Sequence, residues 1–116
     1  MASELKGALE TASELDLTVT GRKSGRDISN PVWFVQEDEK LYLLPVGGAE
    51  SDWYRNVLKT PTIRVGASGI EASARAAPIT DPATVNDIVN KFRAKYGANV
   101  DRYYPKRDVA VELALA

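Results

Sequence analysis

The sequence predicts an α+β protein, mainly β, in which about six antiparallel strands form a small barrel with helices packed outside it. Segments rich in β-branched and aromatic residues alternate with short glycine-containing turns, which is typical of β-hairpins. Other segments repeat apolar residues at the helical period. The 116 residues, 44% of them hydrophobic, suffice for one core, so residues 1–116 are expected to form a single domain. Closing the sheet would hide strand edges that so short a chain cannot otherwise cover.

The first half of the chain is predicted to hold a helix and three strands. Residues 3–14 form a short N-terminal helix, because apolar residues recur there at helical spacing, namely Leu5, Ala8, Leu9 and Ala12. Strands follow at residues 15–20 and 28–36, joined as a hairpin, and a third strand covers residues 40–46. Pro31 cannot donate a ladder hydrogen bond, so it places the second strand at a sheet edge or at a bulge.

The second half is predicted to add two helices and three strands. Residues 51–59 form a short helix with Ser51 as its N-cap. The clearest helix of the chain begins at Asp81-Pro82, because Asp caps well and Pro suits the first helical position, and it ends at Gly97. The remaining strands are expected at residues 62–67, 70–79 and 108–115.

The composition excludes several classes of function. The chain has no cysteine and no histidine, which excludes disulfides, thiol catalysis, thiolate or imidazole metal sites and Ser-His-Asp chemistry. The acidic residues form no Asp-rich loop, so no metal site is expected. A net charge of −1 disfavours a nucleic-acid surface. No apolar run reaches the ~20 residues of a membrane span and no signal peptide is evident, so the expected location is the cytoplasm.

The most informative motif is a glycine-bounded turn that carries cations, Gly21-Arg22-Lys23-Ser24-Gly25, with Arg26 directly after it. The two glycines let the backbone bend so that its N–H groups face one point, and the cations add charge there. This arrangement predicts a site for a phosphate-bearing ligand. The alternative is a solvated hairpin tip, in which the cations serve solubility.

A second loop leads into the helix predicted at residues 51–59. Gly47-Gly48 ends the preceding strand, and a helix N-terminus presents free N–H groups and partial positive charge. Two anion-binding loops on one small barrel would grip the two ends of one phosphorylated ligand. Glu50 and Asp52 argue against this, because they satisfy the helix dipole themselves and would repel a phosphate.

Aromatic residues supply the remaining candidates. Trp53-Tyr54 directly follows the glycine loop and would flank a flat heterocycle, although packing in the core explains the same residues. Tyr103 and Tyr104 follow the long helix. Because histidine and cysteine are absent, one of these tyrosines is a candidate hydrogen-bond donor or proton source; the alternative is a packed loop whose hydroxyls face solvent.

The order of these motifs resembles the deazaflavin-dependent nitroreductases, a family of quinone and nitro-compound reductases that use coenzyme F-420. The resemblance runs from Leu15 to Val65 and continues weakly from Tyr96 to Leu113. It implies a split β-barrel of the FMN-binding kind. The residues that carry it are Thr18-Val19-Thr20-Gly21-Arg22-Lys23-Ser24-Gly25, Pro31, Gly47-Gly48-Ala49, Trp53-Tyr54, Asn56 and Pro61.

The resemblance also implies a reaction and a role for each motif. Reduced F-420 would transfer a hydride to an electron-poor acceptor such as a quinone or nitro compound, while the protein supplies position, dryness and a nearby proton donor. Trp53 would lie against the deazaflavin, and Gly47-Gly48 would support the same ligand. The substrate pocket would be lined by Tyr96 and Tyr103. The phosphate and acidic tail of F-420 would be held by Arg22, Lys23 and Ser24.

The sequence departs from this family near the glycine pair. Pro45-Val46 stands where the family has Ser-Lys, the segment up to Trp53 is shorter, and Glu50 and Asp52 stand where a cation is usual. Three functions therefore stay open: an F-420-dependent oxidoreductase, a split-barrel protein that binds FMN, and a non-catalytic barrel for a small apolar ligand. The strand edges of a short sheet also favour a homodimer.

Overall fold

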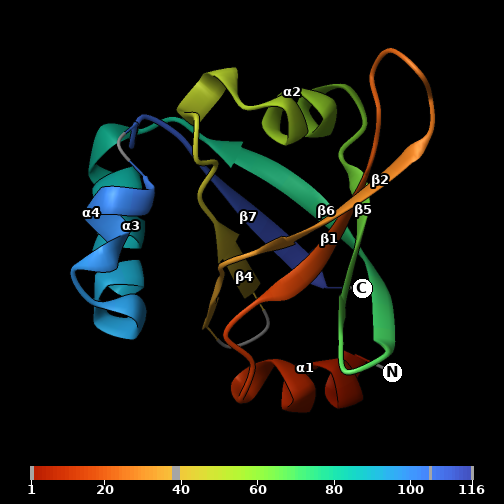
Figure 1. Cartoon of the computed structure of the whole chain (residues 1–116), viewed down its shortest axis with the longest axis horizontal. Coiled ribbons are helices and arrows are strands. Elements are labelled where there is room, and N and C mark those ends of the chain that lie inside the picture. The colour runs from red at the N-terminus through yellow and green to blue at the C-terminus, as the bar shows by residue number, and fades with distance from the viewer. Residues whose placement is uncertain (1, 38–39, 105, 116) are drawn as a thin grey trace.

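The computed structural model describes residues 2–37, 40–104 and 106–115. Seven strands form one antiparallel sheet in the order β2-β1-β5-β6-β7-β4-β3. The sheet curls around its own interior (Figure 1), which confirms the predicted α+β class, mainly β, with a barrel-like antiparallel sheet. The strands are β1 Leu15–Thr20, β2 Asp27–Val32, β3 Val35–Glu37, β4 Lys40–Leu43, β5 Thr62–Ala67, β6 Ile70–Ile79 and β7 Ala110–Leu115.

Helices cover the curled sheet on three sides (Figure 1). α1 lies at one end beside β5 and β6, α2 crosses the opposite end beside β1, and α3 packs with α4 near β3. None of the helices in the described ranges is long and apolar enough to cross a membrane. Their bounds are α1 Ala2–Glu10, the 3-10 turn η1 Gly48–Glu50, α2 Asp52–Lys59, α3 Pro82–Tyr96 and α4 Asn99–Tyr103.

The strand predicted over residues 28–36 is two strands, β2 and β3, which lie at opposite edges of the sheet. Phe34 lies in the chain between β2 and β3 and makes no strand pairing, because two residues of α3 bind its backbone. Its N–H donates to the Tyr96 hydroxyl at 3.0 Å, and its carbonyl accepts from Lys95 Nζ at 2.9 Å. The two edge strands are therefore consecutive in the chain, and Trp33 and Phe34 link them across the open seam of the curled sheet.

Most of the other boundaries follow the sequence prediction. Pro31 lies in an edge strand, as its missing N–H requires. α3 begins after Asp81, whose carboxylate accepts a first-turn N–H at 3.0 Å, and it ends before Gly97. Three predictions were wrong: α1 ends at Glu10 rather than at residue 14, β4 ends at Leu43 rather than at residue 46, and Tyr103 closes the short helix α4 rather than lying in a loop.

The hydrophobic core has two parts. The larger part fills the inside of the curled sheet, where strand side chains meet Leu5 and Leu9 of α1 and Tyr54 and Val57 of α2. The smaller part joins α3 and α4 to β3 and β7 around Phe92, which is fully buried. The larger core therefore fixes α2 over one end of the barrel, and the smaller core holds α4 beside that end.

Candidate functional site

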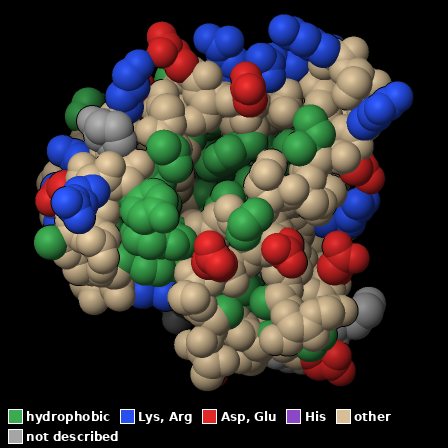
Figure 2. All heavy atoms as spheres, viewed as in Figure 1, with side chains coloured by type: hydrophobic (Ala, Val, Ile, Leu, Met, Phe, Trp, Pro, Cys, Tyr) green, Lys and Arg blue, Asp and Glu red, His purple; other side chains and the backbone are tan. Residues whose placement is uncertain are grey.

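Three adjoining cavities form a groove between α2 and the edge strand β2, which we call the α2 groove. Their volumes are about 220, 390 and 210 Å³. The first lies at the β1–β2 hairpin tip, and the third reaches Trp33 and Tyr103. Figure 2 shows hydrophobic side chains gathered in a hollow on this face. The first two cavities share Ile28, Asp52 and Asn56, and the last two share Pro31, Val32, Val46 and Trp53.

Exposed apolar side chains concentrate along this groove. Of the described residues, four large hydrophobic ones are exposed, and three of them line it: Ile28 at 39%, Val46 at 51% and Tyr103 at 54% exposure. The fourth, Leu58, lines none of the three cavities. Contiguous apolar surface of this kind marks a binding site more often than scattered single residues do.

The hairpin tip at the first cavity uses several of its own N–H groups. Those of Gly21 and Gly25 donate to backbone carbonyls at 2.8 and 2.9 Å, and that of Arg26 donates to Ser24 Oγ at 3.2 Å. Within the described ranges, the N–H groups of Lys23 and Ser24 make no hydrogen bond, and the exposed Lys23 ammonium has no partner. These three donors are left for an anion in the first cavity.

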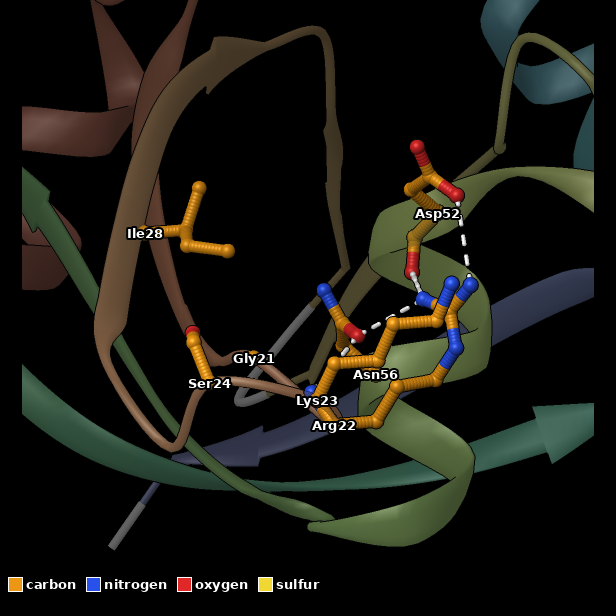
Figure 3. A pocket seen from close by; sticks show the side chains of 7 residues that line it. All are labelled: Gly21, Arg22, Lys23, Ser24, Ile28, Asp52 and Asn56. Carbon is orange, nitrogen blue, oxygen red and sulfur yellow. Dashed lines mark hydrogen bonds and ion pairs between the residues drawn. The ribbon is translucent and has the colours of Figure 1, made fainter.

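Arg22, in contrast, is fixed against α2 (Figure 3). Its Nη1 donates to Asn56 Oδ1 at 2.9 Å and to the Asp52 carbonyl at 3.3 Å, and its Nη2 lies 3.4 Å from the Asp52 carboxylate. Its backbone N–H donates to the same Asn56 oxygen at 3.0 Å, and its carbonyl accepts from Lys59 Nζ at 2.9 Å. Arg22 lines the cavity beside Lys23 and Ser24, but its backbone N–H and both terminal nitrogens of its guanidinium already have acceptors.

No role is predicted from the sequence for Asn56 beyond its place in the order of the motifs. Asn56 is 4% exposed, and its amide oxygen accepts both the backbone N–H and the guanidinium of Arg22. A buried amide that receives two hydrogen bonds from one residue fixes that residue's position. The sequence signal for this role is that Asn56 is a polar residue on the buried face of an amphipathic helix, next to Val57.

The glycine pair lies outside the three cavities. Gly48 is buried and has a φ of +63°, and a Cβ there would lie 2.2 Å from Asp108 Oδ1. The same Asp108 oxygen accepts the Ala49 N–H at 3.3 Å. Neither Gly47 nor Gly48 lines the groove. Gly48 lets the segment around Asp108 approach η1 closely, whereas a Cβ at Gly47 would lie 3.0 Å from Ser51 Oγ.

The two acidic residues near the start of α2 have different surroundings. Glu50 pairs with Lys106 at 2.8 Å, which lowers the pKa of the Glu50 carboxyl, and it does not line the groove. Asp52 lines the first two cavities and faces Arg22. Ser51 holds the predicted N-cap position, but its hydroxyl accepts the Gly47 N–H at 2.8 Å instead of capping α2. The first turn of α2 therefore lacks a side-chain cap beside the second cavity.

Trp53 and Tyr54 are neighbours in the chain with opposite placements. Trp53 is half-buried and lines the second and third cavities. Tyr54 is 3% exposed and belongs to the core inside the sheet, where burial raises its pKa. Consecutive helical residues point about 100° apart, so only Trp53 forms part of the groove wall.

The candidate tyrosines also differ. The Tyr96 hydroxyl accepts the Phe34 N–H at 3.0 Å and lies 2.7 Å from the Ser13 carbonyl, to which it donates. Its ring stacks on Trp33 at 4.2 Å, and burial raises its pKa. Tyr103 packs on the same indole at 4.4 Å, yet its hydroxyl has no hydrogen bond among the described residues. Tyr96 lines none of the three cavities, whereas Tyr103 and Tyr104 both line the third. The Tyr104 hydroxyl also has no hydrogen bond among the described residues, but Tyr104 is 3% exposed and burial raises its pKa, whereas Tyr103 is 54% exposed. Tyr103 is therefore the tyrosine whose hydroxyl is most accessible from the groove.

Solved structures share this fold at low sequence identity. A putative 5-nitroimidazole antibiotic resistance protein from Bacteroides thetaiotaomicron matches with a TM-score of 0.76 and 13% identity, over 97% of this chain and 78% of that one. A putative pyridoxamine 5'-phosphate oxidase from Listeria innocua gives 0.73 and 15%, over 98% and 92%. An F420-H2 dependent reductase, FDR-A, gives 0.68 and 20%, over 87% and 93%. These likenesses confirm the predicted split β-barrel.

The family is shown by a match along most of the chain. Residues 5–111 match the model of a family described as uncharacterized proteins conserved in bacteria, DUF2255. This range contains the hairpin tip, all of α2, the aromatic residues of the third cavity and the segment around Asp108 that contacts η1. The chain therefore belongs to the DUF2255 family.

Proposed function

We propose that the α2 groove binds a flavin-like redox cofactor that carries a phosphate, and that the protein is an oxidoreductase. The observation that carries this proposal is the continuity of the groove. Within the described residues, an unpaired lysine with two free N–H groups lies at one end, apolar residues together with Asn30 and Ser51 line the middle, and aromatic rings line the other end. A phosphate, a ribityl chain and a flat ring follow one another in the same order along such a cofactor.

The residues present fit this group. Lys23 would hold the phosphate with the Lys23 and Ser24 N–H groups, because charge-assisted hydrogen bonds to an anion are the strong ones. Trp53 and Val46 would lie against the ring, where an apolar wall excludes water. When bound and reduced, such a cofactor supplies a hydride. Tyr103, with its free hydroxyl in the third cavity, is the candidate donor of the accompanying proton.

Coenzyme F-420 is the first candidate cofactor, and an electron-poor quinone or nitro compound is the corresponding acceptor. F-420 is supported by the order in which the cationic turn, Trp53 and Asn56 follow one another along the chain, because this order resembles that of the F-420-dependent reductases. The alternative is FMN, which the pairing of Arg22 with Asp52 favours, because that pair leaves less positive charge for an acidic tail. The homodimer stays a prediction, and the unpaired edge of β2 is its candidate contact.

The experiment that tests this function is a fluorescence titration of the purified protein with oxidised F-420, FMN and riboflavin. Micromolar or tighter binding of F-420, with much weaker FMN binding, supports the F-420 reductase, and reduction of quinones and nitro compounds is then measured. Tight FMN binding instead keeps the redox function and changes the cofactor. If none of the three binds, the redox proposal is wrong and a non-catalytic barrel takes its place.

Lys23→Ala is expected to weaken binding of the phosphorylated cofactor by about 1.5–3 kcal/mol, or roughly 10- to 150-fold. Riboflavin affinity and the melting temperature should stay unchanged, because the exposed side chain has no partner within the described part of the chain. The matched control is Arg26→Ala, which removes the same charge from the same hairpin but does not line the first cavity. Equal losses of cofactor affinity in both variants would mean that the effect comes from the net charge and not from a contact between Lys23 and the phosphate.

Trp53→Ala is expected to weaken binding of F-420, FMN and riboflavin alike, by about tenfold or more, because it removes the ring contact rather than the phosphate contact. Titration of each ligand separates this pattern from that of Lys23→Ala. Leu58→Ala is the control, since Leu58 lies on the same helix outside the groove. A loss of stability with unchanged affinity would assign Trp53 to the core.

A further inference from the structure

We propose that Asp52 limits the amount of negative charge that the phosphate end of the α2 groove accepts, so that it lowers the affinity for ligands with a longer anionic tail more than the affinity for ligands with one phosphate group. The inference rests on the proposed function and deepens it, because it assigns a specificity residue to the cofactor site.

Asp52 lies at the phosphate end of the groove, where it lines both the first and the second cavity. Its side chain is 89% exposed, and its carboxylate faces the guanidinium of Arg22, whose side chain is 22% exposed. Both residues line the same cavity as Lys23 (Figure 3). Among the described residues around this cavity, Asp52 is the one with a carboxylate.

The contacts of Arg22 explain how the Asp52 carboxylate changes the charge at the phosphate end of the groove. Nη1 is held by the Asn56 amide oxygen and by the Asp52 carbonyl, so both contacts persist when the Asp52 side chain changes. Nη2 faces the Asp52 carboxylate alone. Removing that carboxylate therefore leaves a fixed guanidinium with a free donor beside Lys23.

The Asp52 carboxylate has two effects, and both weaken the binding of an anionic ligand. The carboxylate repels anions within about one Debye length, some 8 Å at physiological ionic strength, and it also neutralises the adjacent Arg22. A single phosphate is served by Lys23 and the two free N–H groups. Each further phosphate or carboxylate meets Asp52 without a new cation among the residues that line the first cavity, so the penalty grows with the charge of the ligand.

The other acidic residues of this region do not have this position. Glu50 is paired with Lys106 and lies outside the groove. Asp27 begins β2 on the same hairpin, but its carboxylate pairs with Arg64 at 3.0 Å and does not line the first cavity. Asp27→Asn therefore changes the net charge by the same amount as Asp52→Asn and is the matched control.

The test compares wild type, Asp52→Asn and Asp27→Asn in titrations with riboflavin, FMN and F-420 at low salt. In Asp52→Asn we expect F-420 affinity to rise about five- to tenfold, FMN affinity to rise about two- to threefold and riboflavin affinity to stay unchanged. The differences should shrink at high salt, and Asp27→Asn should follow wild type. An unchanged ratio of F-420 to FMN affinity in Asp52→Asn would overturn the assignment.

A second experiment tests the role of Asp52 without a flavin cofactor. Inorganic phosphate and tripolyphosphate are titrated into labelled protein while the amide signals of Lys23 and Ser24 are followed by NMR. Asp52→Asn should improve tripolyphosphate binding several-fold more than phosphate binding. If the flavins fail to bind but this difference is seen, the redox proposal is wrong and the role of Asp52 stands. If neither anion moves the two amides, the phosphate site and the role of Asp52 are wrong, and the flavin titration alone decides the redox proposal.

Discussion

Asn56→Leu is expected to destabilise the protein by about 2–4 kcal/mol, because it leaves the backbone N–H and the guanidinium of Arg22 without their buried acceptor. The amide is 4% exposed, and the two hydrogen bonds that it accepts measure 3.0 and 2.9 Å. Leucine has the same number and branching of side-chain heavy atoms, so the loss comes from the missing acceptor rather than from a cavity. Urea unfolding followed by tryptophan fluorescence gives the free energy of unfolding.

The same substitution should also release the hairpin tip from α2. With Arg22 no longer fixed, the two free N–H groups next to it lose their common orientation, and affinity for a phosphorylated cofactor should fall further than for riboflavin. Asn90→Leu is the matched control, because Asn90 is exposed and accepts one hydrogen bond, from Arg93 at 2.8 Å. A loss in Asn56→Leu no larger than in Asn90→Leu would contradict the anchoring role.

Local sequence signals were enough for the regular parts of this fold. β1, β5 and β6 have the predicted bounds, because each strand is flanked by a turn or helix signal. α3 begins and ends where its Asp-Pro start and its glycine stop indicate. In these segments the residues that decide the structure are neighbours in the chain, so propensity and period are sufficient.

The remaining features depend on contacts between distant residues. β2 and β3 separate because the Tyr96 hydroxyl binds the backbone of Phe34, 62 residues away. The hairpin tip is oriented by α2 through Arg22 and Asn56, which are 34 residues apart. The turn motif predicted an anion site, but the sequence does not reveal which of its cations are already paired. That distinction separates Lys23 from Arg22.

Gly48→Ala is expected to cost about 2–4 kcal/mol, because the new Cβ meets Asp108 and the backbone is in the left-handed region. The clash is severe: the Cβ would lie 2.2 Å from Asp108 Oδ1 and 3.0 Å from Lys106 Cβ, at a φ of +63°. Either the Asp108 carboxylate must rotate away and lose its contact with the Ala49 N–H, or the backbone of η1 must move. The start of α2 follows η1 directly, so Trp53 should shift and cofactor affinity should fall together with stability.

Two glycine variants separate the causes. Gly69→Ala has a φ of +78° with no atom within 4 Å of its Cβ, so it should cost about 1 kcal/mol from the backbone alone. Gly7→Ala, in α1 with free space around it, should stabilise the protein by about 0.5–1 kcal/mol. Adding Asp108→Ala to Gly48→Ala removes the worst contact and should recover part of the stability. If Gly48→Ala costs no more than Gly69→Ala, the close approach of Asp108 does not hold η1, and the glycine pair must be explained by a ligand instead.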